Sequence, residues 1–151
     1  MGNLAFKLAV QQLNTLDDHI KLVAIHPNFT AQHLLMAELI EQDAVYVRFE
    51  GVKLKQTDLQ AQLEAALEAQ IDSKDAAQAG LLLLDECDRA ESKELDQFLV
   101  SLAETLGDSR AVIFSRYVPG VFIHKHSLAD QVAFVPVDQS FMLWDYANRG
   151  E

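Results

Sequence analysis

The sequence has little cysteine, no long apolar run and no basic start. Cys87 is the only cysteine in 151 residues, so the chain forms no internal disulfide, which is usual in a reducing cytoplasm. No apolar run approaches the ~18 residues typical of a membrane-spanning helix. The first residues, Met1–Lys7, lack the basic start and the apolar core of a secretion signal. The sequence therefore predicts a cytoplasmic protein without membrane association.

Positive charge is also scarce. The chain carries 12 Lys and Arg against 23 Asp and Glu, which gives a formal net charge of −11. Such a surface repels phosphate backbones, so we expect no direct nucleic-acid binding by this segment. The expected partners are proteins or other domains of the same polypeptide. A homo-oligomer could form through exposed helix faces. The length fits one domain over residues 1–151.

Short apolar strands alternate with helices along the chain. This pattern is typical of βαβ units around a parallel sheet. We therefore predict a three-layer α/β/α domain with a five-stranded parallel sheet. The expected strands are Ile20–Ile25, Ala44–Phe49, Leu81–Leu84, Ala111–Phe114 and Gln131–Val135.

The helices between these strands show apolar stripes and capping residues. Thr30 is the expected N-cap of a helix with Leu34, Leu35, Leu39 and Ile40 inward. Thr57 and Gln60 resemble a capping box before the stripe Leu59, Leu63, Leu67 and Ile71. Ser92 is the expected N-cap of a helix that buries Leu95, Phe98, Leu99, Leu102 and Leu106 and stops at Gly107.

The strand Leu81–Leu84 runs directly into two carboxylates, Asp85 and Glu86. In a parallel sheet with helical crossovers, the carboxyl ends of the strands form the functional edge. In nucleotide hydrolases, the first acid of such a strand holds Mg²⁺ and the second polarises a water molecule. The residues expected at this edge are His26, Asn28, Thr30, Glu50, Asp85, Glu86, Ser115 and Arg116.

An ordered series of segments over about residues 13–137 resembles the ATPase domain of STAND-type signalling proteins, in particular transcriptional activators of the maltose-regulator kind. Leu22–Leu35 is similar to their first strand, phosphate loop and following helix. Ala44–Phe49 is similar to their second strand, and Leu81–Asp88 resembles the Walker B strand. Ala111–Arg116, followed by Pro119, resembles the sensor strand and its exit. The resemblance implies a P-loop-like strand order and descent from an ATPase.

The phosphate loop of that family has no counterpart in the residue types found here. Such a loop needs glycines that close backbone N–H groups on phosphates, a lysine and a Mg²⁺-binding hydroxyl. At the matching positions stand Asn28, Thr30, Ala31 and Gln32, and no glycine occurs between Gly2 and Gly51. A Cβ costs about 1–2 kcal/mol per residue in the left-handed turns required. The sequence therefore predicts no ATPase activity, no catalytic residue and no bound cofactor or metal.

A second resemblance is to response-regulator receiver domains. Asp85 would stand at the phosphoacceptor position, Ser115 at the hydroxyl position, and Val135-Pro136 where receivers carry Lys-Pro. The acidic pair expected after the first strand is replaced by His26-Pro27-Asn28. Without these acids and the lysine, such a domain would not be phosphorylated efficiently. Strand order separates the two resemblances, because Ala111–Phe114 lies between the first and third strands only in the ATPase lineage.

The last residues carry an apolar cluster on an expected helical extension, 139–151. Its members are Phe141, Met142, Leu143, Trp144 and Tyr146. We expect the chain to be part of a longer bacterial transcriptional regulator. In it, the segment would be a non-catalytic sensory or protein-interaction domain with a vestigial pocket and a degenerate Walker A motif. The alternatives are a pseudo-receiver signalling domain and an active nucleotide hydrolase.

Overall fold

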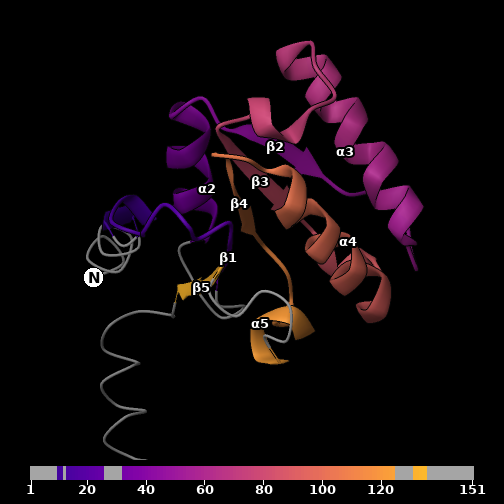
Figure 1. Ribbon diagram of the computed structural model, residues 1–151. Coiled ribbons are helices and arrows are strands. Elements are labelled where there is room, and N and C mark those ends of the chain that lie inside the picture. Colours follow the sequence, from indigo (N-terminus) through magenta and orange to yellow (C-terminus); the bar gives the residue numbers. More distant parts are fainter. Residues whose placement is uncertain (1–9, 12, 26–31, 125–130, 136–151) are drawn as a thin grey trace, which may run out of the picture.

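Strands and helices alternate through the computed structural model, which describes residues 10–11, 13–25, 32–124 and 131–135 (Figure 1). The strands are β1 (Leu22–Ile25), β2 (Val45–Arg48), β3 (Leu81–Asp85), β4 (Arg110–Ile113) and β5 (Val132–Val135). The helices are α2 (Gln32–Glu41), α3 (Gln56–Ile71), α4 (Ser92–Thr105) and α5 (Gly120–His124), with short 3₁₀ turns η1 (Ala76–Gln78) and η2 (Cys87–Arg89). Residues 10, 11, 13 and 14 are also helical.

The five strands form one parallel sheet with the order β2-β3-β4-β1-β5. β4 thus lies between β1 and β3, which confirms the P-loop-like order expected from the sequence. The receiver-like alternative is wrong for this chain, because β1 pairs with β4 and β5 and not with β3. The strand ranges expected from the sequence agree with those observed to within two residues at either end.

Apolar side chains on the two faces of the sheet build two separate cores. On one face, Leu22, Leu82 and Ile113 pack with the buried stripes of α3 and α4. On the other face, Val23, Leu83 and Val112 pack with Leu35 and Leu39 of α2 and with Leu13. Neighbouring strand residues point to opposite faces. The domain therefore has the expected three α/β/α layers, with α2 on one side of the sheet and α3 and α4 on the other (Figure 1).

The apolar stripes of α3 and α4 are confirmed, whereas that of α2 is narrower than expected. Leu35 and Leu39 are buried, but Leu34 and Ile40 are 43% and 44% exposed. Residues four apart lie on one helix face, while Leu34 and Ile40 fall about 100° or more to either side of Leu35. The side chains of Leu34 and Ile40 stay outside the core, because α2 packs on the sheet through the single row formed by Leu35 and Leu39.

Two expected helix starts are wrong, that of α3 by two residues and that of α4 by one. α3 begins at Gln56, and the carboxylate of Asp58 accepts the N–H of Lys55 at 2.9 Å in place of the Thr57–Gln60 pair. In α4, Ser92 is the first helical residue, and Glu91 holds the extended cap conformation. Carboxylates near the first turn also interact favourably with the helix dipole, so they compete with hydroxyl caps. α4 ends at Thr105, and Gly107 adopts the left-handed conformation with φ +57, as expected of a stop signal.

None of the helices in the described parts of the chain is long and apolar enough to cross a membrane. The helical extension expected over 139–151 and the Thr30 cap lie outside the described residues.

Candidate functional site

The carboxyl ends of β3 and β4 meet at a small cavity of about 180 Å³. Four of the residues expected at this edge come together there, because parallel neighbours end on the same side of the sheet. Its lining residues are Gln32, Asp85, Glu86, Asp88, Phe114, Ser115 and Arg116. Of the other expected residues, Glu50 does not line this cavity, and His26, Asn28 and Thr30 lie outside the described residues.

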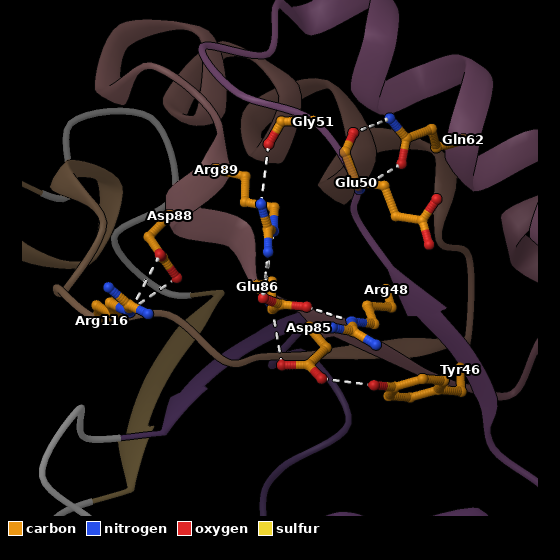
Figure 2. A network of polar contacts seen from close by, with 10 residues as sticks. All are labelled: Tyr46, Arg48, Glu50, Gly51, Gln62, Asp85, Glu86, Asp88, Arg89 and Arg116. Atoms are coloured by element: carbon orange, nitrogen blue, oxygen red, sulfur yellow. Dashed lines mark hydrogen bonds and ion pairs between the residues drawn. The ribbon is translucent and has the colours of Figure 1, made fainter.

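Asp85 is the last residue of β3, and both of its carboxylate oxygens accept hydrogen bonds. One oxygen accepts from the hydroxyl of Tyr46 on the neighbouring strand β2 (Figure 2). The other accepts from the backbone N–H of Glu86 at 2.8 Å. Burial, followed by the hydrogen bond to Asp85, raises the pKa of Tyr46 to about 12. Tyr46 therefore remains a neutral donor to this carboxylate at physiological pH.

Glu86 follows the strand in the left-handed conformation, with φ 57 and ψ 41, and this backbone turns its side chain toward two arginines. One carboxylate oxygen pairs with Nε of Arg48 from β2. The other accepts from Nη2 and Nε of Arg89 at 3.0 and 3.2 Å. The Arg48 guanidinium, helped by Arg89, lowers the pKa of Glu86. A lowered pKa makes Glu86 a poor general base near neutral pH.

Asp88 and Arg116 form the third pair at this edge. The carboxylate of Asp88 accepts the backbone N–H of Arg116 at 3.2 Å and lies 3.7 Å from its Nε. The Arg116 side chain is 90% exposed, whereas that of Asp88 is 21% exposed. This pair joins the turn after β3 to the segment after β4 and forms one wall of the cavity.

Ser115 and Cys87 have internal contacts beside this cavity. Ser115 is 9% exposed, and its hydroxyl accepts the N–H of Tyr117 at 3.4 Å. Cys87 is fully buried, its thiol donates to the carbonyl of Leu84 at 3.4 Å, and burial raises the pKa of the thiol. A buried, protonated thiol is unreactive.

Two of the three acids at this edge pair with arginines: Glu86 with Arg48 and Arg89, and Asp88 with Arg116. Asp85, Glu86 and Asp88 lie among Arg48, Arg89 and Arg116, which are three of the five arginines in the sequence (Figure 2). Arg89 also donates to the carbonyl of Gly51 at 3.1 Å and so joins the loop after β2 to the cluster. Mg²⁺ demands near-ideal octahedral oxygen coordination. At this edge it would have to displace the tyrosine hydroxyl and compete with the guanidinium groups.

Sequence reasoning found the acids but missed Tyr46, Arg48 and Arg89. Tyr46 and Arg48 alternate with Val45 and Val47 on β2, and the register places Arg48 beside Asp85. The alternation signals that these two side chains share one face, but the identity of the neighbouring strand is needed to see which acids they meet. Among the described residues, no group of three or more His, Cys, Asp and Glu side chains is arranged to hold a metal ion.

A larger cavity, about 460 Å³, lies at the opposite end of the sheet. Its polar lining includes Asn14, Asp18, Gln42, Asp108 and Arg110. Nε, Nη1 and Nη2 of Arg110 donate to the carbonyls of Ile20, Leu13 and Asp17 at 2.9, 3.3 and 2.7 Å. This arginine therefore holds the segment before β1 against the sheet.

No protein-family model and no curated protein sequence matches this chain. Among solved structures, the crystal structure of a DNA replication initiation factor superposes with a TM-score of 0.49 at 13% sequence identity. The superposition covers 91% of this chain and 46% of the other, so this chain spans just under half the length of that protein. The sheet itself gives the fold: an α/β domain with a five-stranded parallel sheet in P-loop-like order.

Proposed function

We propose that this chain is a non-catalytic protein-interaction or sensory domain of a bacterial transcriptional regulator, built on an ATPase-like fold that has lost its phosphate-binding loop. The observation that carries the proposal is the pairing of Asp85, Glu86 and Asp88 with donors of the same domain. In a working hydrolase, the corresponding acids must be available to Mg²⁺ and to the attacking water.

The residue types at the first crossover support the same conclusion. Ala31 stands where a phosphate-binding lysine is required, and Gln32 where a Mg²⁺-binding hydroxyl is required. Neither side chain supplies the positive charge or the hydroxyl. Asn28 and Thr30 replace glycines, and a Cβ disfavours the turns that aim backbone amides at phosphates. The acids at the end of β3 are retained, but the residues that would bind phosphate are not. We therefore interpret the acids as remnants of an ancestral nucleotide site.

The charge of the chain favours a protein partner over a nucleic acid. The net charge of −11 opposes association with a phosphate backbone. Three arginines at the carboxyl edge are used in pairing with local acids, so they add little to an electrostatic surface for DNA. We therefore assign the partner role to other domains of the same regulator or to a separate protein.

Calorimetric titration with Mg-ATP separates this function from a nucleotide hydrolase. We expect no binding at micromolar nucleotide for the unmodified chain and for Asp85→Ala. Glu104→Ala, which removes an exposed acid at the far end of α4, is the charge-matched control. Micromolar binding that is retained in Glu104→Ala and lost in Asp85→Ala would overturn the proposal and establish the hydrolase alternative.

A further inference from the structure

β2 forms one edge of the sheet, with β3 as its only neighbouring strand in the described sheet. In a parallel pair, alternate residues turn their backbone N–H and C=O groups toward the neighbour. The N–H of Phe49 donates to the carbonyl of Asp85 at 3.2 Å, so Phe49 faces β3. By this alternation Tyr46, Arg48 and Glu50 direct their backbone groups outward. Such an edge is a template for pairing with another strand.

Two glutamines of α3 already occupy this edge. The side-chain amide of Gln70 accepts the N–H of Tyr46 at 3.0 Å and donates to the carbonyl of the same residue at 2.7 Å. Gln62 does the same with Glu50, with both distances 2.9 Å (Figure 2). A glutamine amide carries the same donor and acceptor as a peptide group. Each glutamine therefore pairs with the edge as a residue of an added strand would.

The spacing of the two glutamines matches the spacing of the edge positions. Eight residues of helix span about 12 Å, and four residues of strand span about 13 Å. α3 returns antiparallel to β2, so Gln70 meets Tyr46 near the start of the strand and Gln62 meets Glu50, the second residue beyond its end. Ala66 lies midway between them, level with Arg48, and has no amide to offer.

We propose that Gln62 and Gln70 act as a surrogate strand that closes the β2 edge against strand addition, both by a second copy of this chain and by an extended peptide. This inference stands independently of the proposed function. It also implies that a protein partner docks elsewhere than on β2. The closure is incomplete at Arg48, where the charged side chain itself discourages edge pairing.

Residue-resolved amide hydrogen exchange tests the closure directly. In the unmodified chain we expect the amides of Tyr46 and Glu50 to exchange at least tenfold more slowly than that of Arg48. Gln70→Ala should accelerate Tyr46 at least tenfold and leave Glu50 unchanged, and Gln62→Ala should do the reverse. Gln60→Ala is the matched control, because Gln60 donates to Glu64 on the same helix at 2.8 Å. Exchange of Tyr46 unaltered by Gln70→Ala would overturn the proposal.

The double variant Gln62→Ala/Gln70→Ala tests the consequence for association. We expect its mass by light scattering to rise with concentration beyond that of the unmodified chain and of Gln60→Ala. A synthetic peptide of residues 44–51 should bind the double variant and not the unmodified chain. Far-UV circular dichroism checks folding, since α3 keeps its buried Leu59, Leu63 and Leu67. If the folded double variant keeps the original mass and ignores the peptide, the edge is not closed by these glutamines.

Discussion

The two ends of the sheet both rely on arginine, but for different contacts. At the carboxyl end, Arg48, Arg89 and Arg116 pair with carboxylates around a cavity of about 180 Å³. At the amino end, Arg110 donates to three backbone carbonyls beside a cavity of about 460 Å³. The larger cavity is thus at the end where Arg110 holds the segment before β1 in place, and the smaller one is at the end with Asp85, Glu86 and Asp88.

The difference shows that, of these two cavities, the larger is not the one lined by the paired acids. Charge pairs at the carboxyl end are partly exposed, and such pairs contribute little to stability. They neutralise acids that would otherwise attract a cation. The Arg110 contacts satisfy three backbone carbonyls before β1, two of them in part-buried hydrogen bonds, and a carbonyl that loses its donor away from bulk water is costly. We therefore expect the contacts of Arg110 at the amino end to contribute more to stability than the charge pairs at the carboxyl end.

The largest effect on stability is expected from Arg110→Met. The substitution keeps much of the apolar stem and removes the donors to the carbonyls of Leu13, Asp17 and Ile20. We expect a loss of about 2 kcal/mol in the free energy of unfolding, measured by urea denaturation. Arg110→Lys retains the charge but not the planar set of donors, so its free energy of unfolding should lie between those of the unmodified chain and Arg110→Met. An unchanged urea midpoint in Arg110→Met would contradict the structural role of this end.

A smaller loss is expected from Tyr46→Phe, which removes one hydrogen bond at the carboxyl end. The free energy of unfolding should fall by about 1 kcal/mol near neutral pH. The pKa of Tyr46 is raised from 10.0 to about 12 in the folded chain. Its contribution is therefore fully present below pH 10 and is lost as the pH rises toward 12.

Urea denaturation of both proteins between pH 8 and pH 11.5 checks this sign. The difference between the unmodified chain and Tyr46→Phe should shrink as the pH rises through this range. Ultraviolet titration of the tyrosinate band should show one high-pKa tyrosine missing from the variant. A difference that grows with pH would mean that Asp85 does not hold the protonated hydroxyl.

The smallest effect is expected from Glu86→Gln. The carboxylate pairs with exposed guanidinium groups, so its loss should change stability less than Tyr46→Phe does, and the difference should weaken further with added salt. The pKa of Glu86 is lowered in the folded chain, so its contribution is present above its ordinary value of 4.5 and is lost as the pH falls through the lowered one. Urea midpoints at low and high salt test this, and a loss as large as that of Arg110→Met would reverse the comparison.

Much of the fold could be predicted because it depends on local patterns. The short apolar run Leu81–Leu84 favoured a buried strand, and the stripe Leu59, Leu63 and Leu67 favoured a helix face turned to the core. The prediction for α2 was poorer, because Leu34 and Ile40 are apolar without being buried. Helix starts were less predictable as well: α3 is capped through the carboxylate of Asp58 in place of a hydroxyl, and α4 begins after Glu91, whose side chain makes no cap hydrogen bond.

The sequence predicted part of the candidate site, namely the residues that follow β3 and β4. Asp85, Glu86, Ser115 and Arg116 meet at one edge, because strand ends of a parallel sheet converge. Tyr46 and Arg48, the partners of Asp85 and Glu86, precede them by 39 and 38 residues. They face the acids only because β2 pairs with β3 in one register. No local pattern gives that register.

The amino-acid sequence by itself determined the layer architecture and the absence of a lysine and glycines at the first crossover, because periodicity and residue type are local properties. The tertiary structure decided the strand order, the pairing of Glu86 and Asp88 with arginines and of Asp85 with the Tyr46 hydroxyl, and the alignment of two glutamines with the β2 edge. These features depend on distances between segments far apart in the chain, and such distances exist only once the sheet has formed.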